Sequence, residues 1–297
     1  MTNAYSKSAS FYICGLTYLL AIAASVITGF YFNHLSYLEM VAYGDLAGTL
    51  VVFIMSIIFS NASLYDAYWS VKPPVIAVFY FLAPEISDIN TTRQFLVLAL
   101  IFFWGARLTW NWARKWEGLV HQDWRYADLK EKTGKFYFFV NLTGIHFFPT
   151  LLVYLSCLPL YPAMSSGNQP IGIFDVLGVI IALIGILFEL VADNQLRAFT
   201  LDPTRKPGET LTKGLWKYSR HPNYFGEVTF WWGIFLFAVP VTGYLWTVVG
   251  AVSITLLFVF ISIPMIDQRM LKRRKNYAEH IKNVSALVPW FPKNSNA

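Results

Sequence analysis

Five polar side chains gather within the stretch SRHPNYFGE, which directly precedes a long apolar run. They are Arg220, His221, Asn223, Tyr224 and Glu227. The pair His221-Pro222 predicts a helix start, because proline is tolerated in a first helical turn, where its missing N–H costs nothing. A helix N-terminus with cationic side chains nearby favours an anion. A purely structural helix entry needs a cap and a proline, so we interpret the stretch as a candidate anion-binding site.

Further charged residues lie before this stretch. Arg205 and Lys206 belong to the loop that leads to it, and both could pair with phosphate groups. Ahead of the loop, Glu189, Asp193 and Arg197 are spaced by four residues and are expected to share one helix face. Structural ion pairing between Asp193 and Arg197 is the alternative interpretation, since an i,i+4 spacing suits a salt bridge. That alternative leaves Glu189 unexplained.

A carboxylate among aromatic rings marks a third cluster, in NASLYDAYWSVKPP, residues 61–74. Asp66 stands between Tyr65 and Tyr68, and the double proline that follows predicts an interruption of the helix. In a buried place such a carboxylate could have a raised pKa and act as an acid. The alternative is a loop at the membrane surface, with its aromatic rings in the interfacial belt.

The fourth cluster is a helix face formed by Trp104, Arg107, Asn111 and Arg114. Arg107 follows a long apolar run, which makes it a candidate site residue. The alternative is that its side chain extends to the membrane surface. The stretch HQDWRY, residues 121–126, follows in the next loop and is interpreted as a turn.

Membrane helices must position these clusters, because 56% of the 297 residues are hydrophobic and only 13% are charged. Apolar runs long enough to suggest membrane helices lie at 11–32, 44–60, 94–106, 136–160, 171–192, 228–241 and 244–265. An eighth run, 62–83, is interpreted as a broken span. The sequence therefore predicts an all-α, polytopic membrane helix bundle. We expect seven to eight transmembrane helices in a single transmembrane domain over residues 1–297.

The placement of charge predicts an orientation. The net charge is +6, and most of the 23 lysine and arginine residues lie in the segments 114–135 and 193–222 and in the tail from residue 266. Under the positive-inside rule these basic loops and the C-terminus face the cytoplasm. The expected location is a bacterial inner membrane or the endoplasmic reticulum. Because the basic residues follow the topology rule, we expect no nucleic-acid partner.

Two further features limit the chemistry. Cys14 and Cys157 both lie in apolar runs, so we expect buried free thiols, with no disulfide and no metal site. The sequence contains neither the dinucleotide-binding glycine motif nor a P-loop, so neither common soluble nucleotide-binding fold is expected.

The stretches DNQLRAF, RKPGE and KGLWKYSRHPNYFGE are similar to the cofactor-binding half of the membrane steroid 5α-reductases and their bacterial relatives. The resemblance extends over about 61–292, and residues 1–60 would then form additional N-terminal helices. It implies an NADPH-dependent oxidoreductase that acts on the CH–CH group of an enone. Its partners would be membrane lipids and a lipophilic, steroid-like small molecule that arrives from the bilayer.

The resemblance also implies residue roles. The implied cofactor-binding residues are Arg107, Asp193, Arg197, Arg205, Lys206, Arg220, His221, Asn223, Tyr224 and Glu227. Asp66 aligns with a glutamate that polarises the substrate ketone in that family. A tyrosine of the family is replaced here by Trp104, so either Tyr68 or Tyr65 would have to supply the phenol or the substrate chemistry differs. Steroid specificity is therefore not carried over.

Two other functions remain open. RHPNYFGE also resembles isoprenylcysteine carboxyl methyltransferases and membrane phospholipid methyltransferases, which bind S-adenosylmethionine. Those enzymes do not usually show the DNQLR and RKPGE stretches or the Asp66 segment. The other alternative is a non-enzymatic membrane protein that binds a lipid or sterol. Copurified nicotinamide, which absorbs near 340 nm, would discriminate the reductase from both.

Overall fold

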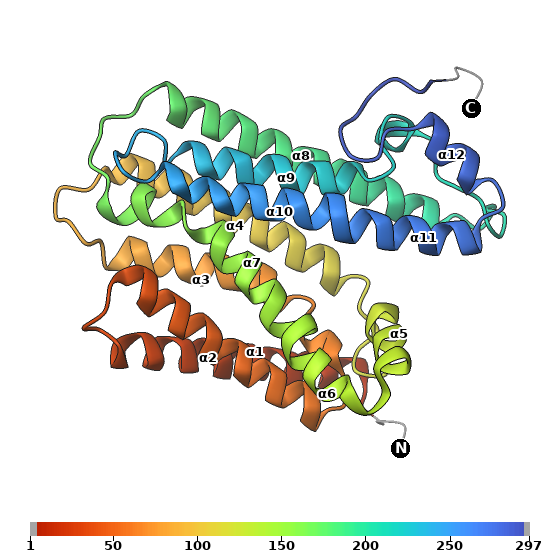
Figure 1. Cartoon of the computed structure of the whole chain (residues 1–297), viewed down its shortest axis with the longest axis horizontal. Helices are drawn as coiled ribbons and strands as arrows, with labels where there is room; N and C mark the ends of the chain where they lie inside the picture. The colour runs from red at the N-terminus through yellow and green to blue at the C-terminus, as the bar shows by residue number, and fades with distance from the viewer. Residues whose placement is uncertain (1–4, 294–297) are drawn as a thin grey trace. The chain divides into compact units, whose positions relative to one another are not determined.

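A computed structural model describes residues 5–293, and these residues form helices without any β-sheet (Figure 1). Six helical stretches are long and apolar enough to cross a membrane. They are Lys7–Tyr31, Tyr37–Ile58, Thr91–Ala113, Trp124–Ser166, Ile173–Leu201 and Leu245–Arg273. The predicted class is confirmed: this is an all-α, multi-pass membrane protein.

Two other predicted spans form shorter helices. The run 62–83 contains α3, Tyr68–Leu82, and the run 228–241 overlaps α9, Pro222–Leu236, each with 15 residues. At about 1.5 Å per residue such a helix is roughly 22 Å long, less than the hydrocarbon thickness of about 30 Å. By length and composition, six helices of the described residues qualify as spans, rather than the seven to eight that were expected.

The chain divides into two compact units, Met1–Gln169 and Pro170–Ala297. The first contains α1 (Lys7–Tyr31), α2 (Tyr37–Ile58), a 3₁₀ turn (Ala62–Tyr65), α3 and α4 (Thr91–Ala113). It continues with α5 (Trp124–Thr133), α6 (Tyr137–Val140) and α7 (Phe148–Cys157). Here α2 packs against α1, and α4 packs against α3. Both predicted thiols, Cys14 and Cys157, are free and buried in this unit.

The predicted interruption of α3 by two prolines is wrong. Pro73 and Pro74 both lie inside the helix. A proline keeps a helical φ but cannot donate to the carbonyl four residues before it, which for Pro74 is the carbonyl of Ser70. A Cβ atom on Gly105 of α4 would lie only 2.8 Å from that carbonyl oxygen. The prolines thus remove hydrogen bonds without ending the helix, and α4 packs closely over the altered turn.

The second unit contains α8 (Ile173–Leu201), α9, α10 (Val249–Leu257), α11 (Ile263–Arg273) and α12 (Tyr277–Asn283). Small residues bring α8 and α9 together, as in many membrane helix pairs. A Cβ atom on Gly185 would lie 2.6 Å from the Gly226 carbonyl oxygen, and one on Gly233 would lie 2.5 Å from the Ala182 nitrogen. This packing places the start of α9 beside the charged part of α8.

Basic segments meet at one end of the second unit. The Arg220 amide donates to the Ser285 carbonyl at 2.9 Å, and the Trp290 amide donates to the Tyr218 carbonyl at 2.9 Å. The loop before α9 and the C-terminal tail therefore lie on the same side, as the charge pattern requires. That this side faces the cytoplasm stays a prediction.

Candidate functional site

The start of α9 has the predicted form. His221 is the residue before the helix, and Pro222 is its first residue. The His221 ring stacks on Tyr224, with ring centroids 5.3 Å apart and an interplanar angle of 7°. The backbone amide of His221 donates to the Ser219 hydroxyl at 3.1 Å. These contacts fix the first turn of α9 and the direction of its side chains.

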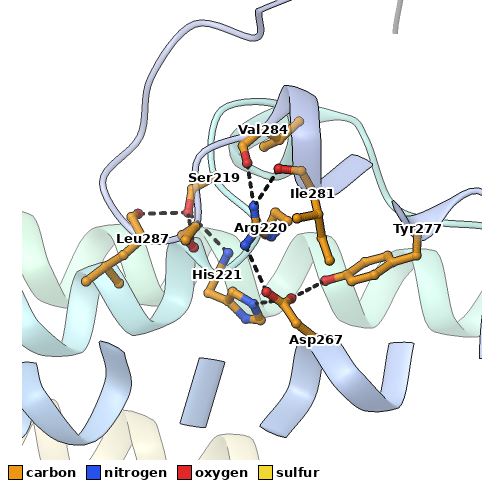
Figure 2. A network of polar contacts seen from close by, with 9 residues as sticks. Ser219, Arg220, His221, Asp267, Tyr277, Ile281, Val284 and Leu287 are labelled. Carbon is orange, nitrogen blue, oxygen red and sulfur yellow. Dashed lines mark hydrogen bonds and ion pairs between the residues drawn. The ribbon is translucent and has the colours of Figure 1, made fainter. Parts of the chain in front are cut away.

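A carboxylate of α11 organises this end of the unit (Figure 2). Asp267 accepts from Arg220 Nη2 at 2.8 Å and from the Tyr277 hydroxyl at 2.7 Å, and lies 3.0 Å from His221 Nε2. Neither Asp267 nor Tyr277 is among the site residues predicted from the sequence. Asp267 follows the last apolar run directly, so an ionisable residue at the end of a membrane helix was the available signal.

Arg220 has a structural role that the sequence analysis missed. Its Nη1 donates to the carbonyls of Ile281 and Val284, at 3.1 and 2.6 Å, while Nη2 pairs with Asp267 (Figure 2). The Ser219 hydroxyl also donates to the Leu287 carbonyl at 2.8 Å. Both terminal nitrogens of Arg220 therefore connect the loop to α11 and the C-terminal tail, and the expected binding of cofactor phosphate by Arg220 stays a prediction.

A cavity of about 230 Å³ lies between this network and the start of α9. Its polar lining includes Arg220, His221, Asn223, Tyr224, Arg274, Tyr277 and His280. Pockets that hold a whole drug-sized ligand have typical volumes of about 300–1,000 Å³. The cavity can therefore hold only part of a dinucleotide, such as one phosphate with its adjoining sugar.

Positive charges are concentrated around the cavity. Burial lowers the pKa of His280 to about 4, and the charges of Arg220 and Arg274 lower it further. Burial likewise lowers the pKa of Arg274, and the charge of Arg205 adds to this effect. His280 is therefore neutral near pH 7, and a bound anion would offset the positive charges of the neighbouring arginines. The electrostatics thus agree with the anion site that the helix start suggested.

The low pKa of His280 predicts a loss of stability in acid. A histidine of the unfolded chain takes up a proton near pH 6.5, whereas folded His280 resists it until about pH 4. Stability is therefore fully present above pH 6.5 and falls as the pH is lowered towards 4. We expect His280→Gln to narrow the difference between melting temperatures at pH 7.5 and 5. If the difference between the two melting temperatures is unchanged in His280→Gln, the lowered pKa of His280 does not cause the loss of stability. His34→Gln, in the exposed connection between α1 and α2, is the matched control.

Only some of the predicted cofactor-binding residues line the cavity. Arg205 and Lys206 are exposed in the loop, where the Arg205 guanidinium lies 5.4 Å from the centre of the Phe199 ring. Neither residue lines the cavity. Glu227 is buried and accepts from Trp231 Nε1 at 2.8 Å, one turn along its own helix.

The DNQLR stretch of α8 includes structural contacts. The Gln195 side chain accepts from the Leu215 amide at 2.9 Å, and Trp216 Nε1 donates to the Ala192 carbonyl at 3.0 Å. These bonds attach the end of the basic loop to α8. Asp193 is buried and Arg197 is half-buried on the same helix, outside the cavity lining.

In the first unit, the segment around Asp66 is not a surface loop. Asn61 Nδ2 donates to the carbonyls of Leu119 and His121 at 2.9 and 3.0 Å. The Tyr126 hydroxyl donates to Asp66 Oδ1 at 2.6 Å. The stretch 121–126, interpreted as a turn, therefore supplies a buried hydrogen-bond partner for the candidate acid.

Asp66 has the raised pKa that its surroundings suggested. It lies outside the six candidate spans, in the connection between α2 and α3. Burial raises the pKa of its carboxyl to about 6, although the nearby Arg125 charge and the Tyr126 hydrogen bond oppose the shift. A carboxyl with such a pKa can hold a proton close to neutral pH and can serve as an acid.

The Tyr68 side chain packs against other aromatic rings. Its ring packs against Tyr18 and Tyr65, with centroid separations of 5.6 and 5.8 Å. Residues two apart at a helix start point in different directions, which explains the separation from Asp66. Tyr65 is also engaged elsewhere, since its hydroxyl lies 2.8 Å from that of Thr150. The phenol that is hydrogen-bonded to Asp66 is that of Tyr126, and a role of Tyr68 or Tyr65 beside the substrate stays a prediction.

The other predicted residues of the first unit lie on α4. Trp104 is fully buried, with its ring centre 6.2 Å from that of Trp69. Arg107 is buried as well, so its side chain does not extend to a surface. Arg114 Nη2 donates to the Asn111 side-chain oxygen at 2.7 Å. These two residues of the predicted helix face therefore lie side by side.

Together these features define a multi-pass, all-α membrane protein with a cationic cavity at a helix start and a half-buried acid in its other unit. The chain belongs to the family DUF1295, described as a protein of unknown function, whose profile matches residues 52–284. A protein of the fission yeast Schizosaccharomyces pombe, described as uncharacterized, is 26% identical over 229 residues. The match covers 70% of this chain and 66% of the yeast protein, slightly less than two thirds of that relative. No solved structure matches the chain.

Proposed function

We propose that this protein is an integral-membrane enzyme that uses NADPH to reduce a carbon–carbon double bond conjugated to a ketone. The observation that carries the proposal is the cationic cavity at the start of α9, lined by Arg220, Arg274 and Asn223. It lies within the part of the chain that resembles the cofactor-binding half of membrane steroid 5α-reductases. The family match covers this half and also the Asp66 segment. The substrate would be lipophilic and would come from the bilayer.

In the cofactor half, the residues of the cavity would bind and orient. Arg274 and His280 would hold a phosphate of NADPH, and Asn223 and Tyr224 would hold the adjoining sugar by hydrogen bonds. Arg205 and Lys206 could reach the same anion from the exposed loop, since the charge of Arg205 already acts on Arg274. When bound, NADPH supplies the hydride for the reduction.

In the substrate half, Asp66 and Tyr126 would act on the ketone. The protonated Asp66 carboxyl would donate a hydrogen bond to the ketone oxygen, which gains negative charge as the double bond is reduced. The Tyr126 hydroxyl, bonded to Asp66 Oδ1 at 2.6 Å, would hold the carboxyl in one orientation. Tyr126 thereby takes the place of the phenol that Trp104 cannot provide. Burial of Asp66 protects its proton from exchange with bulk water.

A methyltransferase that uses S-adenosylmethionine is the second candidate. The specific observation in its favour is the size of the cavity, about 230 Å³, which suits an adenosine portion as well as a sugar phosphate. S-adenosylmethionine carries no phosphate, so the cations of the cavity would contribute little to its affinity. A non-enzymatic sterol- or lipid-binding protein would need no nucleotide.

Removal of one cavity cation should separate these candidates. We expect Arg274→Ala to weaken the binding of NADPH about tenfold or more, because a hydrogen bond to a charged group contributes roughly 1.5–3 kcal/mol. Lys275→Ala removes the same charge from the neighbouring exposed position and should change affinity less than twofold. Titration of the detergent-purified full chain with NADPH and S-adenosylmethionine measures both effects.

The outcomes are distinct. Weak NADPH binding that neither variant changes would contradict the proposed site. Tight binding of S-adenosylmethionine, unaffected by Arg274→Ala, would favour the methyltransferase. No binding of either molecule would leave only the non-enzymatic alternative.

A further inference from the structure

A large apolar groove lies on the first unit, among α1, α2, α3 and α4, with a volume of about 880 Å³. Its lining on α3 extends from Ser70 to Ala83, a length of roughly 20 Å at about 1.5 Å per residue. The volume falls within the range of about 300–1,000 Å³ that is typical of small-molecule sites. The groove therefore has the size and elongated form of a lipid-binding site.

One end of the groove is polar. Lys72 is the ionisable residue of the described lining, and only 3% of its surface is exposed. Its Nζ donates to the Ser25 hydroxyl at 2.6 Å and lies 3.5 Å from Asp45 Oδ1. Neither carboxylate oxygen of Asp45, itself buried, accepts a hydrogen bond. Asp45 does not line the groove itself, and its ion pair with Lys72 balances the charge of the lysine.

The far end of the groove is apolar. Phe30, Phe79, Leu82 and Phe102 line it, whereas the hydroxyls of Ser25, Ser70 and Thr109 lie with Lys72. The Ser70 and Thr109 hydroxyls lie 2.9 Å apart and satisfy each other. An amphipathic molecule would therefore bind with its polar group at Lys72 and its chain along α3.

The polar end favours an uncharged head group. Lys72 and Asp45 form a neutral pair, and a charged ligand would leave one charge unbalanced in a buried place. Asp45 also lies about 12 Å along the helix axis from the start of α2 at Tyr37. Charged groups are costly at such a depth within a membrane segment. A hydroxyl group fits, since its oxygen can accept from Lys72 while its proton is donated to the Ser25 hydroxyl oxygen.

Asp66, Tyr126, Trp104 and Arg107 do not line this groove, whose lining on α4 includes Gly105, Ala106 and Thr109. Ser25 and Asp45 precede residue 52, where the family match begins.

We propose that the groove binds an elongated, uncharged lipid alcohol, with its hydroxyl at Lys72 and Ser25, which both line the groove. The inference does not depend on the proposed reductase activity. Binding can be measured on the full chain in detergent with a long-chain alcohol that carries a diazirine and an alkyne. Probes with the same chain, ending in a carboxylate or in a methyl group, test the head-group preference.

Two glycines of α1 provide matched variants. Gly29 lines the groove. A Cβ atom added to Gly29 would lie 3.7 Å from its nearest neighbour, the Met40 carbonyl oxygen, which is ordinary van der Waals contact. The side chain of Gly29→Leu is therefore expected to fill part of the groove. Gly15 has nothing within 4 Å and does not line the groove, so Gly15→Leu is the control. We expect Gly29→Leu to lower labelling at least tenfold and Gly15→Leu to leave it unchanged.

A double variant tests the polar end. Asp45→Asn with Lys72→Gln keeps the site neutral and should remove the preference for the alcohol over the methyl-ended probe. Labelled peptides from α1 to α4 and the losses described would support the proposal. Equal labelling in Gly29→Leu and Gly15→Leu, equal labelling by all three probes, or a groove covered by a second copy of the chain in crosslinking would overturn it.

Discussion

Asp267→Asn should release the C-terminal tail from the loop before α9. The Asp267 carboxylate holds Arg220 Nη2 at 2.8 Å and the Tyr277 hydroxyl at 2.7 Å, and it lies beside His221. An amide cannot balance the charge of Arg220, and the loss of one partner of a buried ion pair typically costs about 3–5 kcal/mol. Because Arg220 also binds the carbonyls of Ile281 and Val284, the loss is expected to free the whole tail.

Limited trypsin digestion of the purified chain measures this release. Cleavage after Lys275 and Lys282 should accelerate at least tenfold in Asp267→Asn, because local opening becomes more populated. Asp202→Asn, a substitution of the same type at an exposed position of the basic loop, is the control and should leave the rate unchanged. Equal digestion of the two variants would show that Asp267 does not hold the tail.

The same variant links the tail to the proposed cofactor site. Tyr277, Arg274 and His280 line the cavity and belong to the segment that Asp267 and Arg220 hold in place. If the cavity is the NADPH site, Asp267→Asn should also weaken NADPH binding, although its side chain does not line the cavity. Normal digestion with weak binding would instead indicate a local effect on His221.

The helices could be predicted from the sequence wherever hydrophobic length decides the structure. Six apolar runs became helices long enough to span. The start of α9 could also be predicted, because His221-Pro222 is a local signal. The continuation of α3 through its two prolines could not be predicted from the sequence. Pro73 and Pro74 indicate a break when only the local hydrogen bonds are counted, whereas the close approach of Gly105 from another helix is a tertiary feature.

The residue types of the candidate site could be predicted more readily than their partners. Asp66 was expected to be an acid with a raised pKa, and burial gives it one. Its partner Tyr126 lies 60 residues further along the chain. Likewise, Asp267 meets His221 across 46 residues. No spacing rule relates residues so far apart, so Tyr68 was paired with Asp66 by proximity in sequence, and the role of Arg220 in holding the tail was missed.

Asp66→Leu should abolish most turnover of an enone while NADPH binding persists. If the Asp66 carboxyl donates to the ketone oxygen, its loss removes one preorganised donor, which typically lowers kcat by about 10²–10³-fold. Asp66→Glu should keep part of the activity, because the acid is retained and only its reach changes. The activity of the native protein should fall as the pH rises through about 6, where the carboxyl loses its proton.

Two tyrosine variants decide which phenol supports the acid. Tyr126→Phe removes the hydroxyl that bonds Asp66 at 2.6 Å and should lower kcat more than KM changes. Tyr68→Phe removes a hydroxyl from a buried ring that packs on Tyr18 and Tyr65, away from Asp66, and should have a smaller effect. NADPH oxidation with any accepted enone, followed across pH, provides the measurement. A larger loss in Tyr68→Phe would restore the pairing expected from the sequence. Full activity in Asp66→Leu would remove this carboxyl from the mechanism, because a group without contact to the substrate cannot stabilise its developing charge.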